Sequence, residues 1–131
     1  MQKNSEIEKI VKLALIRLGI KCDLVGFAYL ARAIEYVIET PSKLYNLAKL
    51  FGEVAEDYEV RNPFRVEANI QNAITQAYNT KGLQGINDMY KMEVFDEKYK
   101  PTTAEVINLI VEYYNLGLYK NVDTSFSRAV K

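Results

Sequence analysis

Apolar residues recur at spacings of three and four along most of the chain, which is the period of an amphipathic α-helix. The first such run begins at Ser5, a suitable N-cap residue with Glu8 three positions later, and ends at Gly19, a residue type common at helix ends. Further helices are predicted over residues 26–39, 42–51, 53–58, 63–78, 83–90 and 101–113. The pattern predicts an all-α domain of six or seven helices.

The segment Gly52–Tyr78 contains a short helical pattern, a turn and a longer helical pattern. Asn62 followed by Pro63 favours a helix start, because an asparagine side chain can cap the helix and proline suits its first position. A short helix, a tight turn and a second helix form the outline of a helix-turn-helix, which places its second helix in the major groove of DNA. We therefore predict a helix-turn-helix over about residues 53–78.

Two segments depart from the helical pattern. Lys91–Tyr99 is predicted to be an extended surface loop. The apolar side chains in and before it either cover the core or form a surface for a partner; they are Met89, Tyr90, Met92, Val94, Phe95 and Tyr99. From Leu116 to Lys131 the pattern fades, and we expect a loosely held polar tail. Residues 1–115 are thus predicted to form a single helical domain, followed by a tail over residues 116–131.

The composition excludes several classes of protein. A chain of 131 residues suits one domain, and it contains no apolar run near the ~18 residues of a membrane span. The lack of such a run argues against a membrane partner, and the single cysteine, Cys22, cannot form an internal disulfide, which favours a cytoplasmic protein. The chain has no histidine, the usual general base and commonest metal ligand, and no thiol cluster replaces it. We therefore predict no enzyme activity, no catalytic residue, no metal and no cofactor.

The charge balance bears directly on DNA binding. Seventeen basic residues balance seventeen acidic ones, whereas a typical DNA-binding domain is basic. A local basic stripe can still exist on a neutral domain. The short helix of the predicted motif carries four acidic residues, which would repel phosphate if they faced it: Glu53, Glu56, Asp57 and Glu59.

Four pieces of the chain resemble a known family. In chain order they are LGIKCDLVGFAYLARAIEYV, LFGEVAEDYE, RVEANIQNAI and KYKPTTAEVI, and the likeness extends from about Leu18 to Ile110. They are similar to the DNA-binding effector domain of the sporulation master regulator, stage zero sporulation protein A. The resemblance implies an all-α domain whose helix-turn-helix binds a short DNA box, usually as a dimer, and regulates transcription. Family members usually carry this domain behind a phospho-accepting receiver; here it begins almost at Met1, so we expect a domain without a receiver.

The resemblance also concerns the residues that read DNA. Glu67 matches a family residue that contacts bases, and Arg65 matches a basic position of the family. The family's two base-reading arginines fall on Ala68 and Gln71 in this chain. Arginine paired with guanine is the commonest specific contact and contributes about 1–3 kcal/mol of discrimination. The family's DNA box is therefore not expected to carry over.

Helical spacing gives the second helix of the motif an outward face rich in amides. Asparagine and glutamine can pair with adenine through N6 and N7, although such a face can also be merely solvated. With the residues that the resemblance adds, the predicted base-facing set is Arg65, Glu67, Ala68, Asn69, Gln71 and Asn72. The predicted phosphate contacts, which would fix the register without reading sequence, are Arg61, Lys81, Lys98 and Lys100.

Two functions remain in view. The first is a sequence-specific transcriptional regulator that binds double-stranded DNA, expected as a homodimer because one short helix reads too few base pairs. The alternative is a protein-interaction module, for example an antagonist of a host regulator or a phage or plasmid accessory protein. Such a module would have kept the fold and lost specific DNA reading. The neutral charge, the acidic short helix and the two missing arginines favour the alternative.

Overall fold

The computed structural model describes residues 5–120, which form an all-helical domain without a strand in this range. The predicted all-α class is confirmed. The six α-helices are α1 (Ser5–Arg17), α2 (Val25–Glu39), α3 (Leu47–Asp57), α4 (Pro63–Asn79), α5 (Gly85–Tyr90) and α6 (Thr103–Asn115). Two short 3-10 helices, η1 (Pro41–Tyr45) and η2 (Gly82–Gln84), lie in the connections.

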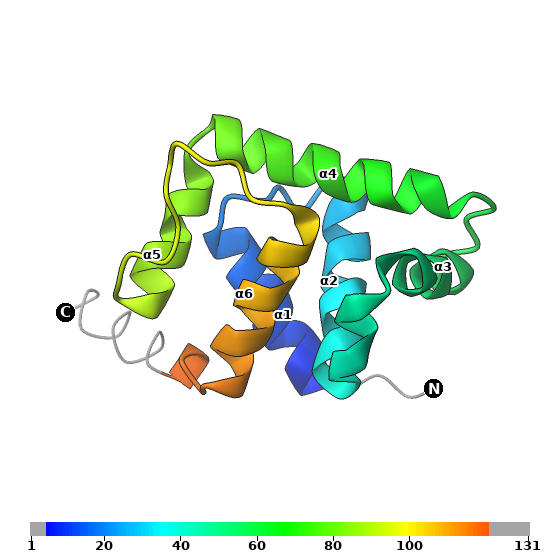
Figure 1. Cartoon of the computed structure of the whole chain (residues 1–131), viewed down its shortest axis with the longest axis horizontal. Helices are drawn as coiled ribbons and strands as arrows, with labels where there is room; N and C mark the ends of the chain where they lie inside the picture. Colours follow the sequence, from blue (N-terminus) through cyan, green and yellow to red (C-terminus); the bar gives the residue numbers. More distant parts are fainter. Residues whose placement is uncertain (1–4, 121–131) are drawn as a thin grey trace.

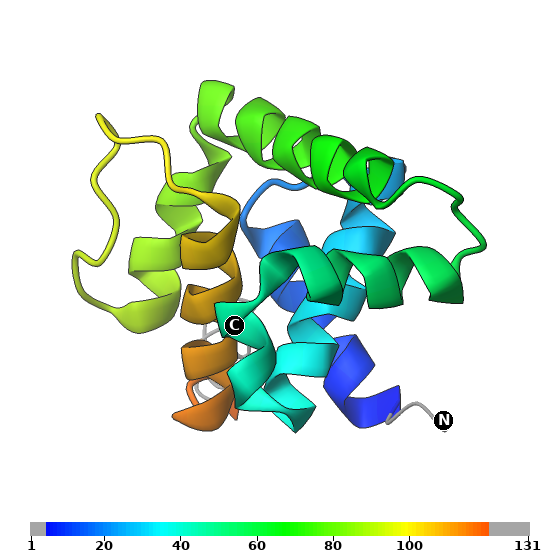
Figure 2. The same ribbon diagram turned by 45° about the vertical axis from the view of Figure 1, so that its right-hand side comes forward.

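Helix α2 is the centre of the fold. Helices α1, α3, α4 and α6 all pack against it, and most of its side chains are buried. Helix α4 crosses the N-terminal end of α2 and lies along one edge of the molecule, at the top of Figure 1. Helix α3 packs beneath α4 and beside α2, as both views show (Figures 1 and 2). This arrangement gives α4 one face against the core and leaves its opposite face at the surface.

The crossing of α4 over α2 depends on a glycine. Gly26 is buried directly beneath the backbone of Asn69, and a Cβ atom at Gly26 would overlap the Asn69 carbonyl group. The same Cβ would lie 3.2 Å from the Cβ of Ala73, so small residues meet from both helices. The close approach lets α4 bury its inner face against α2 and α3; the buried residues of α4 are Val66, Ile70, Ala73, Ile74 and Ala77.

Several predicted helix ends are confirmed. Pro63 is the first residue of α4, and the Asn62 side chain accepts a hydrogen bond of 3.0 Å from the Phe64 N–H. The last helix was predicted to open at Pro101, with Thr102 or Thr103 as its cap; Thr102 is the cap of α6, and Glu105 completes a reciprocal capping box. Gly19 follows α1 with a positive φ of 78°, a conformation that glycine adopts without strain.

The predicted helix break at Gly52 is wrong. Helix α3 continues through this residue from Leu47 to Asp57, and Asn46 caps it by accepting from the Lys49 N–H at 3.2 Å. A glycine inside a helix costs only about 1 kcal/mol. Burial of the residues around it outweighs that cost; they are Leu50, Phe51, Val54 and Ala55. The helix that precedes the turn is therefore longer than predicted, and residues 41–45 form η1 instead.

The segment 91–102 is a loop, as predicted, and its apolar side chains differ in burial. Phe95 is buried in the core, and Val94 packs against it partly buried. Met92 and Tyr99 are exposed. Val94 and Phe95 thus cover the core, as do the buried Met89 and the half-buried Tyr90 of α5, whereas a partner surface that includes Met92 and Tyr99 stays a prediction.

Residues 116–120 follow α6 and also pack against the domain. The ring of Tyr119 stacks on that of Tyr114, with 5.5 Å between the ring centroids, and Leu118 packs against the core. The remainder of the predicted tail, residues 121–131, lies outside the described residues. None of the helices between residues 5 and 120 combines the length and apolar character needed to cross a bilayer.

The contact beneath α4 predicts opposite effects for two glycine substitutions. Gly26→Ala should lower the free energy of unfolding by about 1–3 kcal/mol, because the added methyl group overpacks the crossing. Gly52→Ala is the matched control: its Cβ would meet no atom within 4 Å, so it should raise stability by about 0.5–1 kcal/mol. Urea denaturation followed by circular dichroism measures both. Equal stabilities of the two variants would contradict the close approach.

Candidate nucleic-acid interface

The outer face of α4 is the surface on which the predicted base-facing residues gather. Four of them are exposed there: Arg65, Ala68, Gln71 and Asn72. Glu67 and Asn69 are half-buried, since they lie toward the flanks of the helix. Phe64, which the sequence analysis did not assign to the site, is also exposed, with 76% of its surface accessible.

The side-chain amides on α4 differ in whether they already make a hydrogen bond within the helix. The side-chain amide of Asn69 donates to the Arg65 carbonyl at 2.7 Å, so it is held against its own helix. The Gln71 amide makes only a long contact of 3.5 Å to the Glu67 carboxylate. Asn72 is exposed, and its side chain makes no hydrogen bond to any residue within 5–120. The side-chain amides of Asn72 and Gln71 are therefore accessible to a ligand.

The predicted phosphate contacts are all exposed and lie around α4. Arg61 lines an open groove together with Arg65 and Asn69 at the N-terminal end of the helix. At the C-terminal end, Lys81 and Lys98 line a shared groove of about 340 Å³. Lys100 lines a further groove beside Gln71, in the middle of α4. The structure thus brings together along one helix cations that are far apart in the sequence.

The side chain of Asn87 fixes the loop that carries Lys98 and Lys100. Its Oδ1 accepts hydrogen bonds from the N–H groups of Val94 and Phe95 at 2.8 and 2.9 Å. Its Nδ2 donates to the Phe95 carbonyl at 3.0 Å. Asn87 was not among the site residues predicted from the sequence. An asparagine inside a short predicted helix was the available signal, because asparagine favours side-chain bonds to nearby backbone over helix interiors.

The far end of the same loop is tied to α6. Tyr99 donates a hydrogen bond of 3.1 Å to the carboxylate of Glu105, which also accepts from the Thr102 N–H at 2.8 Å. The hydrogen bond from the Thr102 N–H, together with that from Tyr99, lowers the pKa of Glu105. The lysines of the loop therefore extend from a segment that is anchored on both sides.

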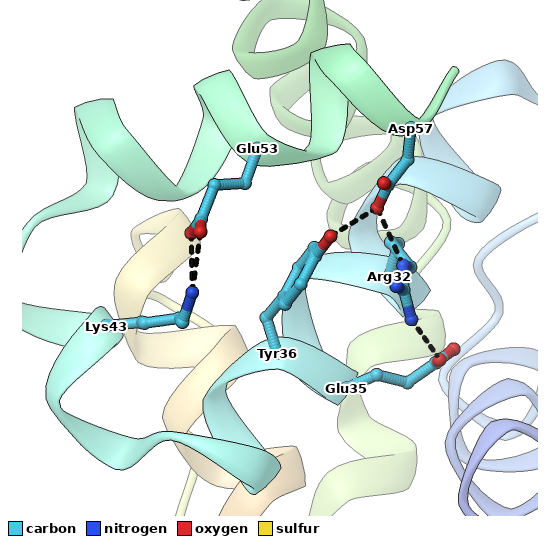
Figure 3. A network of polar contacts seen from close by, with 6 residues as sticks. All are labelled: Arg32, Glu35, Tyr36, Lys43, Glu53 and Asp57. Carbon is cyan, nitrogen blue, oxygen red and sulfur yellow. Dashed lines mark hydrogen bonds and ion pairs between the residues drawn. The ribbon is translucent and has the colours of Figure 1, made fainter. Parts of the chain in front are cut away.

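Two of the four acidic residues near the turn are neutralised from within the domain. Figure 3 shows Glu53 and Asp57 extending from α3 toward η1 and α2. Glu53 pairs with Lys43 at 2.7 Å, and Asp57 accepts from the Arg32 guanidinium at 2.8 Å (Figure 3). Glu56 and Glu59 are exposed. The repulsion expected from four acids is therefore partly cancelled.

A buried ion pair supports the Asp57 contact. Arg32 is only 5% exposed and also donates to Glu35 at 3.1 Å (Figure 3). Burial alone would lower the pKa of Arg32, but its hydrogen bond to Asp57 and the nearby charges outweigh this and raise it. Burial and then the hydrogen bond to Asp57 raise the pKa of Tyr36 to about 12, so this hydroxyl stays a donor to Asp57. Charged residues within the apolar second helix were the sequence signal for this network.

An exposed polar helix that follows a short turn, with cations around it, is typical of helical DNA-binding domains. The comparison with known families agrees with this class. Residues 11–114 match the family model described as sporulation initiation factor Spo0A C terminal. The chain belongs to this family of DNA-binding effector domains, which is regulatory and not enzymatic, and the resemblance drawn from the sequence is confirmed. The match extends from α1 to α6 and so includes every helix that packs on α2.

The three hydrogen bonds of Asn87 predict local loosening when they are removed. In Asn87→Ala the Val94 and Phe95 amides lose their acceptor, and since each bond contributes about 1 kcal/mol, they should exchange with solvent at least about fivefold faster. Asn87→Asp is the matched control, because it keeps the acceptor and loses only the donor to the Phe95 carbonyl. Hydrogen exchange followed by NMR measures both. Unchanged exchange in Asn87→Ala would show that Phe95 packing alone holds the loop.

Proposed function

We propose that this protein is a sequence-specific transcriptional regulator that binds double-stranded DNA, with α3 and α4 acting as a helix-turn-helix. The observation that carries the proposal is the outer face of α4, which is exposed along its length and accompanied by cations at both ends and beside its middle. Membership of a family of DNA-binding effector domains supports the same reading.

The dimensions of α4 suit the major groove. Its 17 residues make a helix about 25 Å long, and the groove is about 12 Å wide, so residues at both ends can reach the phosphates that border it. Arg61 at one end and Lys81 and Lys98 at the other would contact these phosphates, with Lys100 beside the middle. Such contacts fix the register and leave the outward side chains over the base edges.

The base-reading role falls on the outward side chains of α4. Gln71 and Asn72 present amides that can pair with adenine N6 and N7, and Arg65 can reach a base or an adjacent phosphate. Ala68 offers a methyl group, while Glu67 and Asn69 border the face. This set favours A·T pairs. The two arginines implied by the resemblance would instead have contacted guanine.

The neutral net charge is compatible with this role because the charges are unevenly placed. Glu53 and Asp57 are paired with Lys43 and Arg32, so they add little repulsion toward a phosphate near the turn. The electrostatic attraction that remains between this neutral domain and DNA is modest, and one helix reads few base pairs. We therefore propose that the protein acts in the cytoplasm as a homodimer on DNA, so that two half-sites together provide specificity.

A second function, that of a protein-interaction module, is favoured by one observation. Phe64 exposes most of its ring beside Ala68 on the same helix, and apolar exposed residues of this kind also anchor protein partners. Enrichment of specific duplexes in a selection from random DNA at about 0.1 M salt separates the two functions, because an interaction module would enrich none.

The free amide of Asn72 predicts a loss of sequence preference. Asn72→Ala should reduce the discrimination between the selected duplex and one carrying a G·C pair for A·T by about 1–3 kcal/mol, with a smaller change in overall affinity. Fluorescence anisotropy titrations measure both quantities. Asn108→Ala, which removes an exposed asparagine of α6, is the control and should change neither. Retained discrimination in Asn72→Ala would remove this residue from the base-reading set.

The position of Lys100 beside Gln71 predicts a phosphate contact. Lys100→Ala should weaken binding to all duplexes alike and lower the slope of log affinity against log salt by about 1, because one fewer counterion is released. Lys9→Ala, on the N-terminal half of α1, removes an exposed lysine away from α4 and should leave the slope unchanged. Equal slopes for the two variants would contradict the placement of Lys100.

A further inference from the structure

Phe64 lies in the first turn of α4, where its backbone is fixed and its ring is exposed. Its backbone N–H donates to the Asn62 side chain at 3.0 Å, and the preceding Pro63 occupies the first position of the helix. The ring is nevertheless 76% exposed, although burying a phenylalanine side chain is strongly favourable. Single exposed apolar residues are common on protein surfaces, but this one lies within the candidate interface.

The ring of Phe64 belongs to the outward face of α4. Residues four apart lie on the same side of a helix, so Phe64 and Ala68 are neighbours, and both are exposed. Gln71 and Asn72 follow one turn later on this side. Val66 and Ile70, by contrast, point into the core. The first half of the outward face therefore carries an apolar pair, Phe64 and Ala68, beside the exposed Arg65, and the next turn carries amides.

The chemistry of the major groove suggests a partner for this apolar pair. The C5 methyl of thymine is the apolar feature among the base edges there, and alanine and phenylalanine are side chains that contact it. The N-terminal residues of a reading helix are those that meet base edges. Arg61 and Arg65 line a groove at this end of α4, together with one acid, Glu59. Arg65 is also the residue after Phe64, so two cations lie near the start of the helix, where they suit a polyanion better than an apolar protein surface.

We propose that Phe64 and Ala68 read thymine methyl groups in the major groove. This inference rests on the proposed function and sharpens it: the target is an A·T-rich half-site with thymine methyls under Phe64 and Ala68 and adenine edges facing Gln71 and Asn72. Phe64 is then a specificity-determining residue. The resemblance implies an arginine where this chain has Ala68. The alanine methyl group would then contact a thymine methyl group in place of the guanine contact of that arginine.

Replacement of thymine by deoxyuridine tests the proposal, because it removes the methyl group and keeps every hydrogen-bonding atom. The full chain is titrated with its selected duplex and with versions in which single thymines are replaced. At the thymine under Phe64, wild-type affinity should fall about fourfold, the effect of one buried methyl group. Phe64→Ala should bind the thymine duplex more weakly and bind both versions equally well. Its urea midpoint should match that of wild type, since the ring is exposed.

Tyr45→Ala is the matched control, since Tyr45 is an aromatic residue 88% exposed at the end of η1. It should keep both the affinity and the preference for thymine. Specific binding that ignores every thymine methyl would overturn the inference while the proposed function stands. A preference for thymine that persists in Phe64→Ala would overturn the assignment to Phe64. Failure of wild type to enrich any duplex would overturn the proposed function, and the inference with it.

Discussion

The contact between Gly26 and the backbone of Asn69 determines where α4 lies. Because no side chain separates the two helices there, α4 rests directly on the start of α2 and presses its inner apolar residues into the core. The same contact fixes the rotation of α4 about its own axis, since only one face can be buried. Phe64, Ala68 and Asn72 are directed outward as a consequence. The candidate reading surface is thus set by Gly26, a residue of another helix.

A second constraint links stability to electrostatics. Arg32 is buried in α2 and requires partners, since an unpaired buried charge costs several kcal/mol. It finds Glu35 on its own helix and Asp57 at the end of α3, so the ion pair positions α3 beside α2 (Figure 3). The pairing also offsets the charge of Asp57, whose side chain stays partly exposed before the turn. One contact therefore orients the first helix of the proposed motif and reduces its repulsion toward DNA.

The basic side chains around α4 come from three parts of the chain. Arg61 belongs to the turn, Lys81 follows α4, and Lys98 and Lys100 belong to a loop that Asn87, Phe95 and Glu105 hold in place. A neutral chain can in this way present a locally favourable surface for an anion. The face that α4 presents differs from that implied by the family resemblance in its methyl and amide groups at positions 68 and 71, and these groups are the basis of the proposed preference for A·T over G·C pairs.

Local rules were enough for the helical class and for most helix ends. The period of the apolar residues, the Asn62-Pro63 start and the Thr102 cap act within a few residues, so they can be read from the chain. The break expected at Gly52 failed because a glycine costs less than the burial on either side of it contributes, a balance that only packing reveals. The outward residues of α4 also followed from helical spacing. Tertiary structure alone decided which acids are paired, how Asn87 holds the loop and which cations meet along α4, because these contacts join residues distant in the sequence.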